Sequence, residues 1–215
     1  MKSTVQPATR GRPRTITRER IADAGIEIGL PNITFVGVAV ALGVSHMALY
    51  KHVPSLEELK RLVAEEIFSR WKIPRARGKG RGDLKEYLVV FSASVQAFVK
   101  AHPGVTPYVI RRLAATQPML DKIVGHQRHI AQAFGLSMEQ ARWLLATVAF
   151  HGLAVADTVY SVAGREPVVD ADRAMAEAEM EAELDQGMRA LIVGALVMLE
   201  DGLRLPGSIE HLMTN

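Results

Sequence analysis

The chain has 215 residues, 48% of them apolar, which is enough to build a packed core and excludes a disordered protein. It contains no cysteine, and this excludes disulfides, thiolate metal sites and a cysteine nucleophile. The net charge of +3 is divided unevenly, because residues 1–82 carry 15 Lys or Arg against 7 Asp or Glu and residues 83–215 carry 11 against 16. This distribution suits a protein that places its basic N-terminal part on polyanionic DNA and leaves the other end in solvent.

Residues 1–16 are polar and contain three closely spaced arginines, Arg10, Arg12 and Arg14. A flexible basic arm of this kind is able to follow DNA into the minor groove. The alternative is a disordered, solubilising tail, and both interpretations stay open at this point.

Residues 17–28 have the pattern of an amphipathic helix. Thr17 is a plausible N-cap, and small or apolar residues recur after it at intervals of three and four positions, which places them on one face. Gly29 and Pro31 then end the helix. The predicted buried face comprises Ile21, Ala24, Gly25 and Ile28.

Residues 34–59, TFVGVAVALGVSHMALYKHVPSLEEL, predict a helix-turn-helix followed by a further helix. Thr34 and Ser45 are predicted to cap two short helices, and Gly43 between them is able to adopt the positive φ of a tight turn. Ser55 and Glu58 have the spacing of a capping box for the third helix. A second helix presented in this way fits the major groove of DNA. The buried stripe predicted for the third helix comprises Leu56, Leu59, Val63 and Ile67.

The run LGVSHMALYKHVPSLEEL resembles the DNA-binding signature of the TetR family of bacterial transcriptional regulators, and the upstream GRPR and the helix after it match that pattern as well. The resemblance is specific over roughly the first third of the chain and extends to the rest only in layout. It implies an all-α homodimer with an N-terminal helix-turn-helix DNA-binding domain of three to four helices. It also implies a larger, helical C-terminal domain for ligand binding and dimerisation.

The resemblance and the helix geometry together predict which side chains contact DNA. Residues 45–48 are expected near base edges, Tyr50 and His52 near phosphates, and Lys51 near either. Packing between helices is the alternative role for Tyr50. The complete predicted set is Arg10, Arg12, Arg14, Thr34, Ser45, His46, Met47, Ala48, Tyr50, Lys51, His52 and Lys60.

Three positions depart from the family pattern. Leu56 stands where family members commonly carry a phosphate-binding lysine, and Lys60 lies one turn later. Gly37 lowers the helix propensity of the first short helix by up to about 1 kcal/mol. Val40 is apolar where a solvent-facing residue is expected. These changes either weaken DNA binding, or Val40 and Leu56 meet another surface.

Residues 70–82, RWKIPRARGKGRG, contain six basic residues and no acidic one, and their glycines and proline predict an inter-domain loop. The loop either touches DNA phosphate or is only solvated. The predicted organisation is therefore a basic arm at 1–16, a DNA-binding domain at 17–70, the loop at 71–82, and an effector-binding and dimerisation domain at 83–215.

Helical periodicity continues through the C-terminal part, and no strand-like alternation of useful length is present. The acidic helix predicted at 172–185 has Glu177 and Glu181 at a repulsive spacing, which favours a solvated face. The predicted helices span residues 83–101, 105–115, 118–134, 137–162, 172–185 and 187–205.

The helices at 137–162 and 187–205 are apolar nearly all round, which favours burial on several sides and hence a homodimer. In the first of them the small residues cluster on one face, and Thr147 and His151 lie on the opposite one. We expect the small face to pack against another helix and the Thr147 face to line a ligand cavity. The alternative is that Thr147 bonds its own preceding turn and His151 is a satisfied core histidine. The small face comprises Leu145, Ala149, Gly152 and Ala156.

The longest near-continuous apolar run, residues 143–156, is shorter than the roughly 20 residues that span a bilayer. The N-terminus is polar and basic and lacks the apolar segment of a secretory signal. The sequence therefore favours a cytoplasmic protein without a membrane partner.

A small-molecule effector needs aromatic faces and a few polar anchors, and the C-terminal part offers both. Asp157 and Arg111 are the candidate polar anchors, although residues at helical spacing are also typical of plain core. The complete candidate lining is Phe91, Tyr108, Arg111, Met119, Trp143, Thr147, His151, Asp157 and Tyr160.

Catalytic and metal-binding patterns are weak. His126 and His129 share a helix face, but no third ligand is evident and the neighbouring Gln127 and Arg128 favour an exposed surface. The chain has no glycine-rich phosphate loop after a strand, no HExxH and no nucleophile elbow. We therefore expect no metal, no cofactor and no enzymatic activity.

The sequence as a whole predicts a ligand-responsive, sequence-specific transcriptional regulator. Repression from a roughly palindromic double-stranded DNA operator, relieved by an unidentified small-molecule effector, is the expected mode of action. The alternatives are an architectural DNA-binding protein without an effector, and an enzyme or carrier that uses a helical pocket.

Overall fold

The computed structural model of the protein describes residues 16–77, 83–110, 115–160 and 173–201, and all regular structure within them is helical. This confirms the predicted all-α class. The elements are α1 (Arg18–Ile28), the 3-10 turn η1 (Leu30–Asn32), α2 (Phe35–Leu42), α3 (His46–Tyr50), α4 (Leu56–Arg70), α5 (Leu84–Ala101), α6 (Thr106–Ile110), α7 (Gln117–Phe134), α8 (Met138–Tyr160) and α9 (Arg173–Glu200).

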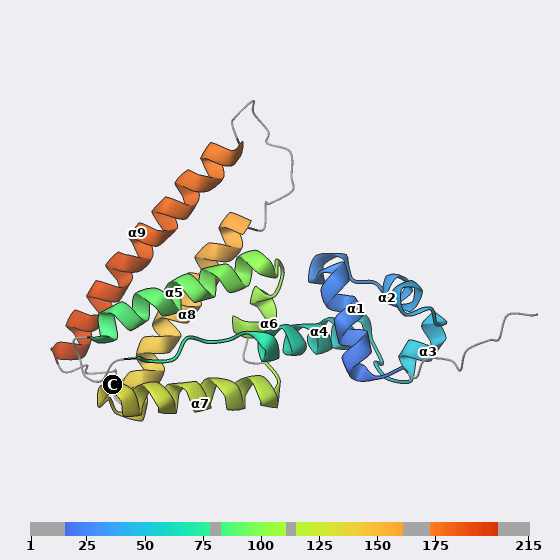
Figure 1. Ribbon diagram of the computed structural model, residues 1–215, viewed down its shortest axis with the longest axis horizontal. Coiled ribbons are helices and arrows are strands. Elements are labelled where there is room, and N and C mark those ends of the chain that lie inside the picture. Colours follow the sequence, from blue (N-terminus) through green and yellow to red (C-terminus); the bar gives the residue numbers. More distant parts are fainter. Residues whose placement is uncertain (1–15, 78–82, 111–114, 161–172, 202–215) are drawn as a thin grey trace, which may run out of the picture.

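Two groups of helices lie at opposite ends of the long axis of the molecule (Figure 1). Helices α1, α2 and α3 form a small group, which we call the head, and helices α5 to α9 form a larger one, which we call the body. Helix α4 packs against α1 in the head and against α6 and α7 in the body. It is therefore the element through which the two groups are joined.

Local sequence signals determine the helix boundaries of the head. The hydroxyl of Thr34 accepts a hydrogen bond from the Gly37 amide at 2.9 Å, and the Ser45 hydroxyl caps α3 in the same way. Gly43 joins α2 to α3 at φ 67° and ψ 36°, a left-handed conformation that favours glycine. The predicted cap of α1 at Thr17 is present as well. The predicted helix-turn-helix is thus confirmed in its boundaries.

Helix α1 of the head packs closely against α4. A methyl group added to Gly25 would lie 2.3 Å from Cγ2 of Val63, a fully buried side chain. Ile21 and Leu49 are also completely buried. The absence of a side chain at position 25 is therefore what lets the two helices approach.

Two details predicted for α4 are wrong. Leu56 is 39% exposed and does not belong to the buried stripe, because it is the first residue of the helix and projects past the core. The stripe gains Leu62 and Phe68 instead. Ser55 caps the helix, but the Glu58 carboxylate forms an ion pair with Arg61 at 2.9 Å, and only the Ser55 half of the capping box is recorded.

Helix α8 is the central element of the body and contacts α5, α7 and α9. Gly152 lies against Val95 of α5, so at this position the predicted small-residue face packs against another helix of the same chain. Both halves of its predicted capping box, Ser137 and Gln140, are formed. By length and composition α8 is also able to cross a membrane, but 44% of its most apolar segment is buried and core helices of soluble proteins pass the same test.

The C-terminal region differs from prediction in that a single helix, α9, replaces the two expected at 172–185 and 187–205. Gly187 lowers the local helix propensity by about 1 kcal/mol, but Leu184 and Met188 are buried on either side of it and this packing outweighs that cost. Glu181 is also more than a solvated acid, because it binds Nζ of Lys100 at 2.6 Å and the hydroxyl of Tyr160 at 2.8 Å. The side chain of Glu177 lies outside the described residues.

Candidate functional sites

Helix α3 lies at the far end of the head, away from the body (Figure 1). Its predicted DNA-facing side chains, together with Thr34 and Lys60 nearby in sequence, retain access to solvent. Arg10, Arg12 and Arg14 lie outside the described residues. The exposed members of the predicted set are Thr34, Ser45, His46, Met47, Tyr50 and Lys51, and the half-buried members are Ala48, His52 and Lys60.

Tyr50 combines the two roles considered for it. Its ring stacks on Phe35 of α2, with ring centroids 4.3 Å apart and planes inclined by 15°, and the ring of His46 meets it edge-on. The residue is nevertheless 45% exposed. The ring therefore fixes α3 on α2 while part of the side chain stays accessible.

Arg18 is a basic residue of this surface that the sequence interpretation did not include. Its guanidinium is exposed and Nη1 donates a hydrogen bond to the backbone carbonyl of His52 at 3.3 Å. The signal was its place in the first turn of α1, directly after the basic arm. This bond ties the start of α1 to the end of α3 and brings a further positive charge to the same end of the head.

A cavity of about 760 Å³ lies in the body, between the C-terminal end of α4 and helices α5 to α8. Trp71, Phe91 and His126 form one wall of near-parallel rings. The Trp71 and Phe91 planes are inclined by 24°, and those of Phe91 and His126 by 27°. Leu145 and Ala149 of α8 also line the cavity. Its volume falls within the range of pockets that bind drug-sized molecules.

The polar groups of the wall rings form hydrogen bonds within the protein. The Trp71 indole donates to Oγ of Ser94 at 3.1 Å, and Nε2 of His126 lies 2.7 Å from the Tyr87 hydroxyl. Burial lowers the pKa of His126 to about 4, and the nearby His129 and Arg75 act in the same direction, so the imidazole is neutral at pH 7. Burial also raises the pKa of the Tyr87 hydroxyl. The wall is therefore uncharged around these rings.

Of the predicted ligand residues, the structure brings Phe91 to this cavity. Tyr108 lies on α6 next to the lining residue Val109, and Arg111 lies outside the described residues. Met119 is buried and its sulfur accepts a hydrogen bond from the Thr116 amide. The other predicted residues, which do not line the cavity, are Trp143, Thr147, His151, Asp157 and Tyr160.

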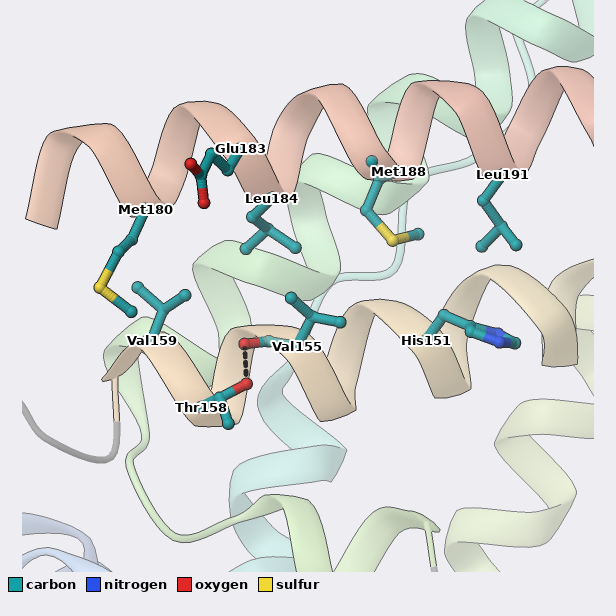
Figure 2. A pocket seen from close by; sticks show the side chains of 10 residues that line it. His151, Val155, Thr158, Val159, Met180, Glu183, Leu184, Met188 and Leu191 are labelled. Carbon is teal, nitrogen blue, oxygen red and sulfur yellow. Dashed lines mark hydrogen bonds between the residues drawn. The ribbon is translucent and has the colours of Figure 1, made fainter.

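His151 instead borders a groove of about 420 Å³ between α8 and α9, which Figure 2 shows with side chains of both helices facing each other. It is exposed, and its Nδ1 lies 2.7 Å from the carbonyl oxygen of Thr147. His151 is therefore not a core residue, and the bond to the preceding turn is made by His151 and not by Thr147. The expectation that this face lines a ligand cavity stays a prediction, with His151 at the groove and Thr147 outside both cavities. Thr158, also in the groove, bonds the carbonyl of Val155.

The histidine pair on α7 has protein partners. His126 contacts Tyr87, and Nε2 of His129 accepts a hydrogen bond from the Ala76 amide at 3.3 Å. Gln127, expected on an exposed surface, is buried beside the cavity. No group of three metal-binding side chains occurs among the described residues.

Lys122 of α7 connects the cavity wall to α4. Its ammonium group donates hydrogen bonds to the carbonyl oxygens of Phe68, Ser69 and Trp71, at 2.8, 2.8 and 2.6 Å. Cations are favourable at the C-terminal end of a helix, where carbonyl groups lack intrahelical partners. Since Phe68 and Trp71 themselves line the cavity, α4 ends at the cavity and is held there by α7.

No protein-family model matches the sequence, and no curated protein matches it. Solved structures do match over most of the chain. Apo ActR from Streptomyces coelicolor is 18% identical, with a TM-score of 0.64, and the match covers 85% of this chain and 98% of that one. The chain has the TetR fold.

Two further structures with the TetR fold were solved with ligands. A variant of TetR from Acinetobacter baumannii AYE in complex with minocycline is 19% identical, with a TM-score of 0.61, and the match covers 84% of this chain and 96% of that one. ActR in complex with actinorhodin is 18% identical, with a TM-score of 0.62, over 85% of this chain and 96% of that one. The two-part TetR fold thus accounts for the head and the body together.

Proposed function

We propose that this protein is a cytoplasmic, ligand-responsive transcriptional regulator of the TetR family that represses from a palindromic operator as a homodimer. The observation that carries the proposal is a solvent-exposed α3 in a helix-turn-helix at one end of a TetR fold, with an aromatic cavity at the other. We found no feature of the described residues that favours an enzyme, a metal centre or a resident cofactor.

DNA recognition would depend on α3 as the helix that enters the major groove. Ser45, His46 and Met47 begin the helix and are exposed, so they are placed to reach base edges. Lys51 and Arg18 supply positive charge for phosphates on either side. The fixed stacking of Tyr50 on Phe35 would hold the helix in one orientation while it binds.

Dimerisation would use α8 and α9. Apolar side chains on α9 that face away from α5 remain exposed in the single chain, among them Val193, Val197 and Met198, and Val155 of α8 is exposed at the groove between the two helices. Exposed apolar side chains that lie together are typical of a protein interface. A second copy packed on it with two-fold symmetry would place two α3 helices for two half-sites of a palindrome.

Ligand binding would act on DNA binding through α4. Phe68 and Trp71 at its C-terminal end line the cavity, and Lys122 holds that end on α7. A ligand that moves this end of α4 would change the separation of the two α3 helices in a dimer. Linkage then requires that operator DNA weakens ligand binding by the same factor by which the ligand weakens DNA binding. TetR and ActR, which have the same fold, were solved in complex with minocycline and actinorhodin, and this supports a small-molecule effector for the present chain.

The decisive experiment is selection of bound sequences from a random duplex pool by the full-length protein at near-physiological salt. An enriched palindrome is expected. Salt-sensitive retention without sequence preference would identify an architectural protein instead. Absence of any retention would contradict the regulator and favour a carrier or enzyme that uses the cavity.

A variant tests the role of α3 directly. Tyr50→Phe combined with Lys51→Ala keeps the ring stacked on Phe35 but removes a hydroxyl and a positive charge. We expect operator affinity to fall by about tenfold or more, measured by fluorescence anisotropy. Lys85→Ala, an equal change of charge on an exposed residue of α5, is the matched control and should bind normally. Equal affinity of both variants would contradict the assignment of α3.

A further inference from the structure

The cavity has a composition that restricts the chemistry of its ligand. Trp71, Phe91 and His126 line one wall with near-parallel rings, and the centroids of neighbouring rings lie 6.4 and 5.8 Å apart. The indole nitrogen of Trp71 bonds Ser94, and Nε2 of His126 bonds the hydroxyl of Tyr87, so both atoms already have protein partners. Flat aromatic surfaces are what such a wall binds best, because offset stacking adds to the burial of apolar area.

One amide side chain among the described lining residues, that of Gln127, has no protein partner. Gln127 is only 9% exposed, and its carboxamide makes no hydrogen bond to any part of the chain that the structure describes. The amide atoms of Gln127 are not among the fully buried polar atoms without a partner in the described residues, so they are accessible from the cavity to a ligand that bonds them. Gln117, the other amide of the lining, is occupied by Asp121.

Arg142 of α8 gives the cavity its charge. It lines the cavity while remaining exposed, so it lies where the cavity opens to solvent, and no ion pair to it is recorded among the described residues. The described residues of the lining include no Asp or Glu, and His126 is neutral at pH 7. An arginine without a carboxylate partner at the edge of an apolar cavity is suited to an anionic group of the ligand.

We propose that the ligand of this cavity is a planar, multi-ring aromatic acid. Its rings lie on the wall formed by Trp71, Phe91 and His126, a carbonyl or hydroxyl group bonds the carboxamide of Gln127, and its acidic group pairs with Arg142. This inference rests on the proposed function in that the ligand is taken to be the effector. The inference adds to the proposed function the chemical class of the effector and the roles of Gln127 and Arg142.

Calorimetric titration of the full-length protein with three probes tests the assignment. The probes are anthraquinone-2-carboxylate, which has rings, carbonyl oxygens and an acid; anthracene-2-carboxylate, which lacks the carbonyl oxygens; and dodecanoate, an acid without rings. We expect the anthraquinone acid to bind tightest and dodecanoate at least about tenfold more weakly. Equal binding of dodecanoate, or no binding of either aromatic acid, would overturn the proposal.

Variants separate the two polar roles. Arg142→Gln should weaken both aromatic acids by about tenfold, whereas Gln127→Leu should weaken the anthraquinone acid and leave the anthracene acid nearly unchanged. Arg128→Gln, an exposed arginine of α7 that does not line the cavity, is the control. Circular dichroism would verify that each variant is folded, and normal binding by a folded Arg142→Gln variant would sink the proposed role of Arg142.

Failure of this inference is distinguishable from failure of the proposed function. A protein that selects a palindrome but binds no aromatic acid remains a regulator with another class of effector. A protein that binds the acids with the expected variant pattern but retains no DNA confirms the ligand class and contradicts the regulator.

Discussion

The head and the body use apolar residues in opposite ways. In the head, Ile21, Val38 and Leu49 are completely buried, and Gly25 is in such close contact with Val63 that no methyl group fits between them. In the body, longer helices enclose a cavity of about 760 Å³ that protein side chains leave unfilled. Close packing gives a rigid, uniquely placed α3, whereas unfilled space gives a body that a ligand is able to complete.

The largest expected effect on the free energy of unfolding comes from a leucine-to-alanine substitution, compared between the head and the body. Leu49→Ala removes a fully buried side chain from the packed head and should lower the free energy of unfolding by about 2–5 kcal/mol. Leu145→Ala removes a buried side chain that already borders the cavity, so fewer contacts are lost and a smaller loss is expected. Chemical denaturation followed by circular dichroism measures both. A larger loss for Leu145→Ala would refute the contrast in packing.

Glycine substitutions make the same comparison with an added methyl group. Gly25→Ala places its Cβ against Val63 of α4 and should destabilise the head by about 1–3 kcal/mol. Gly125→Ala on the exposed side of α7 has no neighbour within 4 Å and should stabilise the protein by up to about 1 kcal/mol, because alanine has the higher helix propensity. Thermal unfolding followed by calorimetry compares them. Shifts of the midpoint in the same direction would show that α1 and α4 are able to move apart.

The head was predictable because its signals are local. Thr34, Gly43 and Ser45 each act on backbone groups within a few residues, so their chemistry is visible in the sequence alone. Arg18 was missed because its partner, the carbonyl of His52, is distant in sequence and carries no side-chain signal. Leu56 was misassigned because periodicity does not show where a helix extends past its core.

The body was less predictable because its cavity is made by helices that are distant in sequence. The helical wheel of α8 separated a small-residue face from the face of Thr147, but it contained no information on which neighbour each face meets. In the structure Leu145 and Ala149 of the small face line the cavity, while His151 faces the groove with α9. Gln127 was assigned to the surface by its polarity alone, although it is buried beside the cavity.

The last expected effect is a pH dependence that arises from a buried histidine of the body. The pKa of His126 is lowered by burial to about 4, whereas an unfolded chain has the ordinary value of 6.5. Between these values the unfolded state binds more protons, so the stability present above pH 6.5 is lost as the pH falls toward 4. Because the ring is partly exposed to water, we expect a loss of about 1–2 kcal/mol. Chemical denaturation of the protein and of the His126→Gln variant at pH 7 and pH 5 measures the contribution of His126 to the free energy of unfolding. Equal losses of stability in the two proteins would show that other groups are responsible.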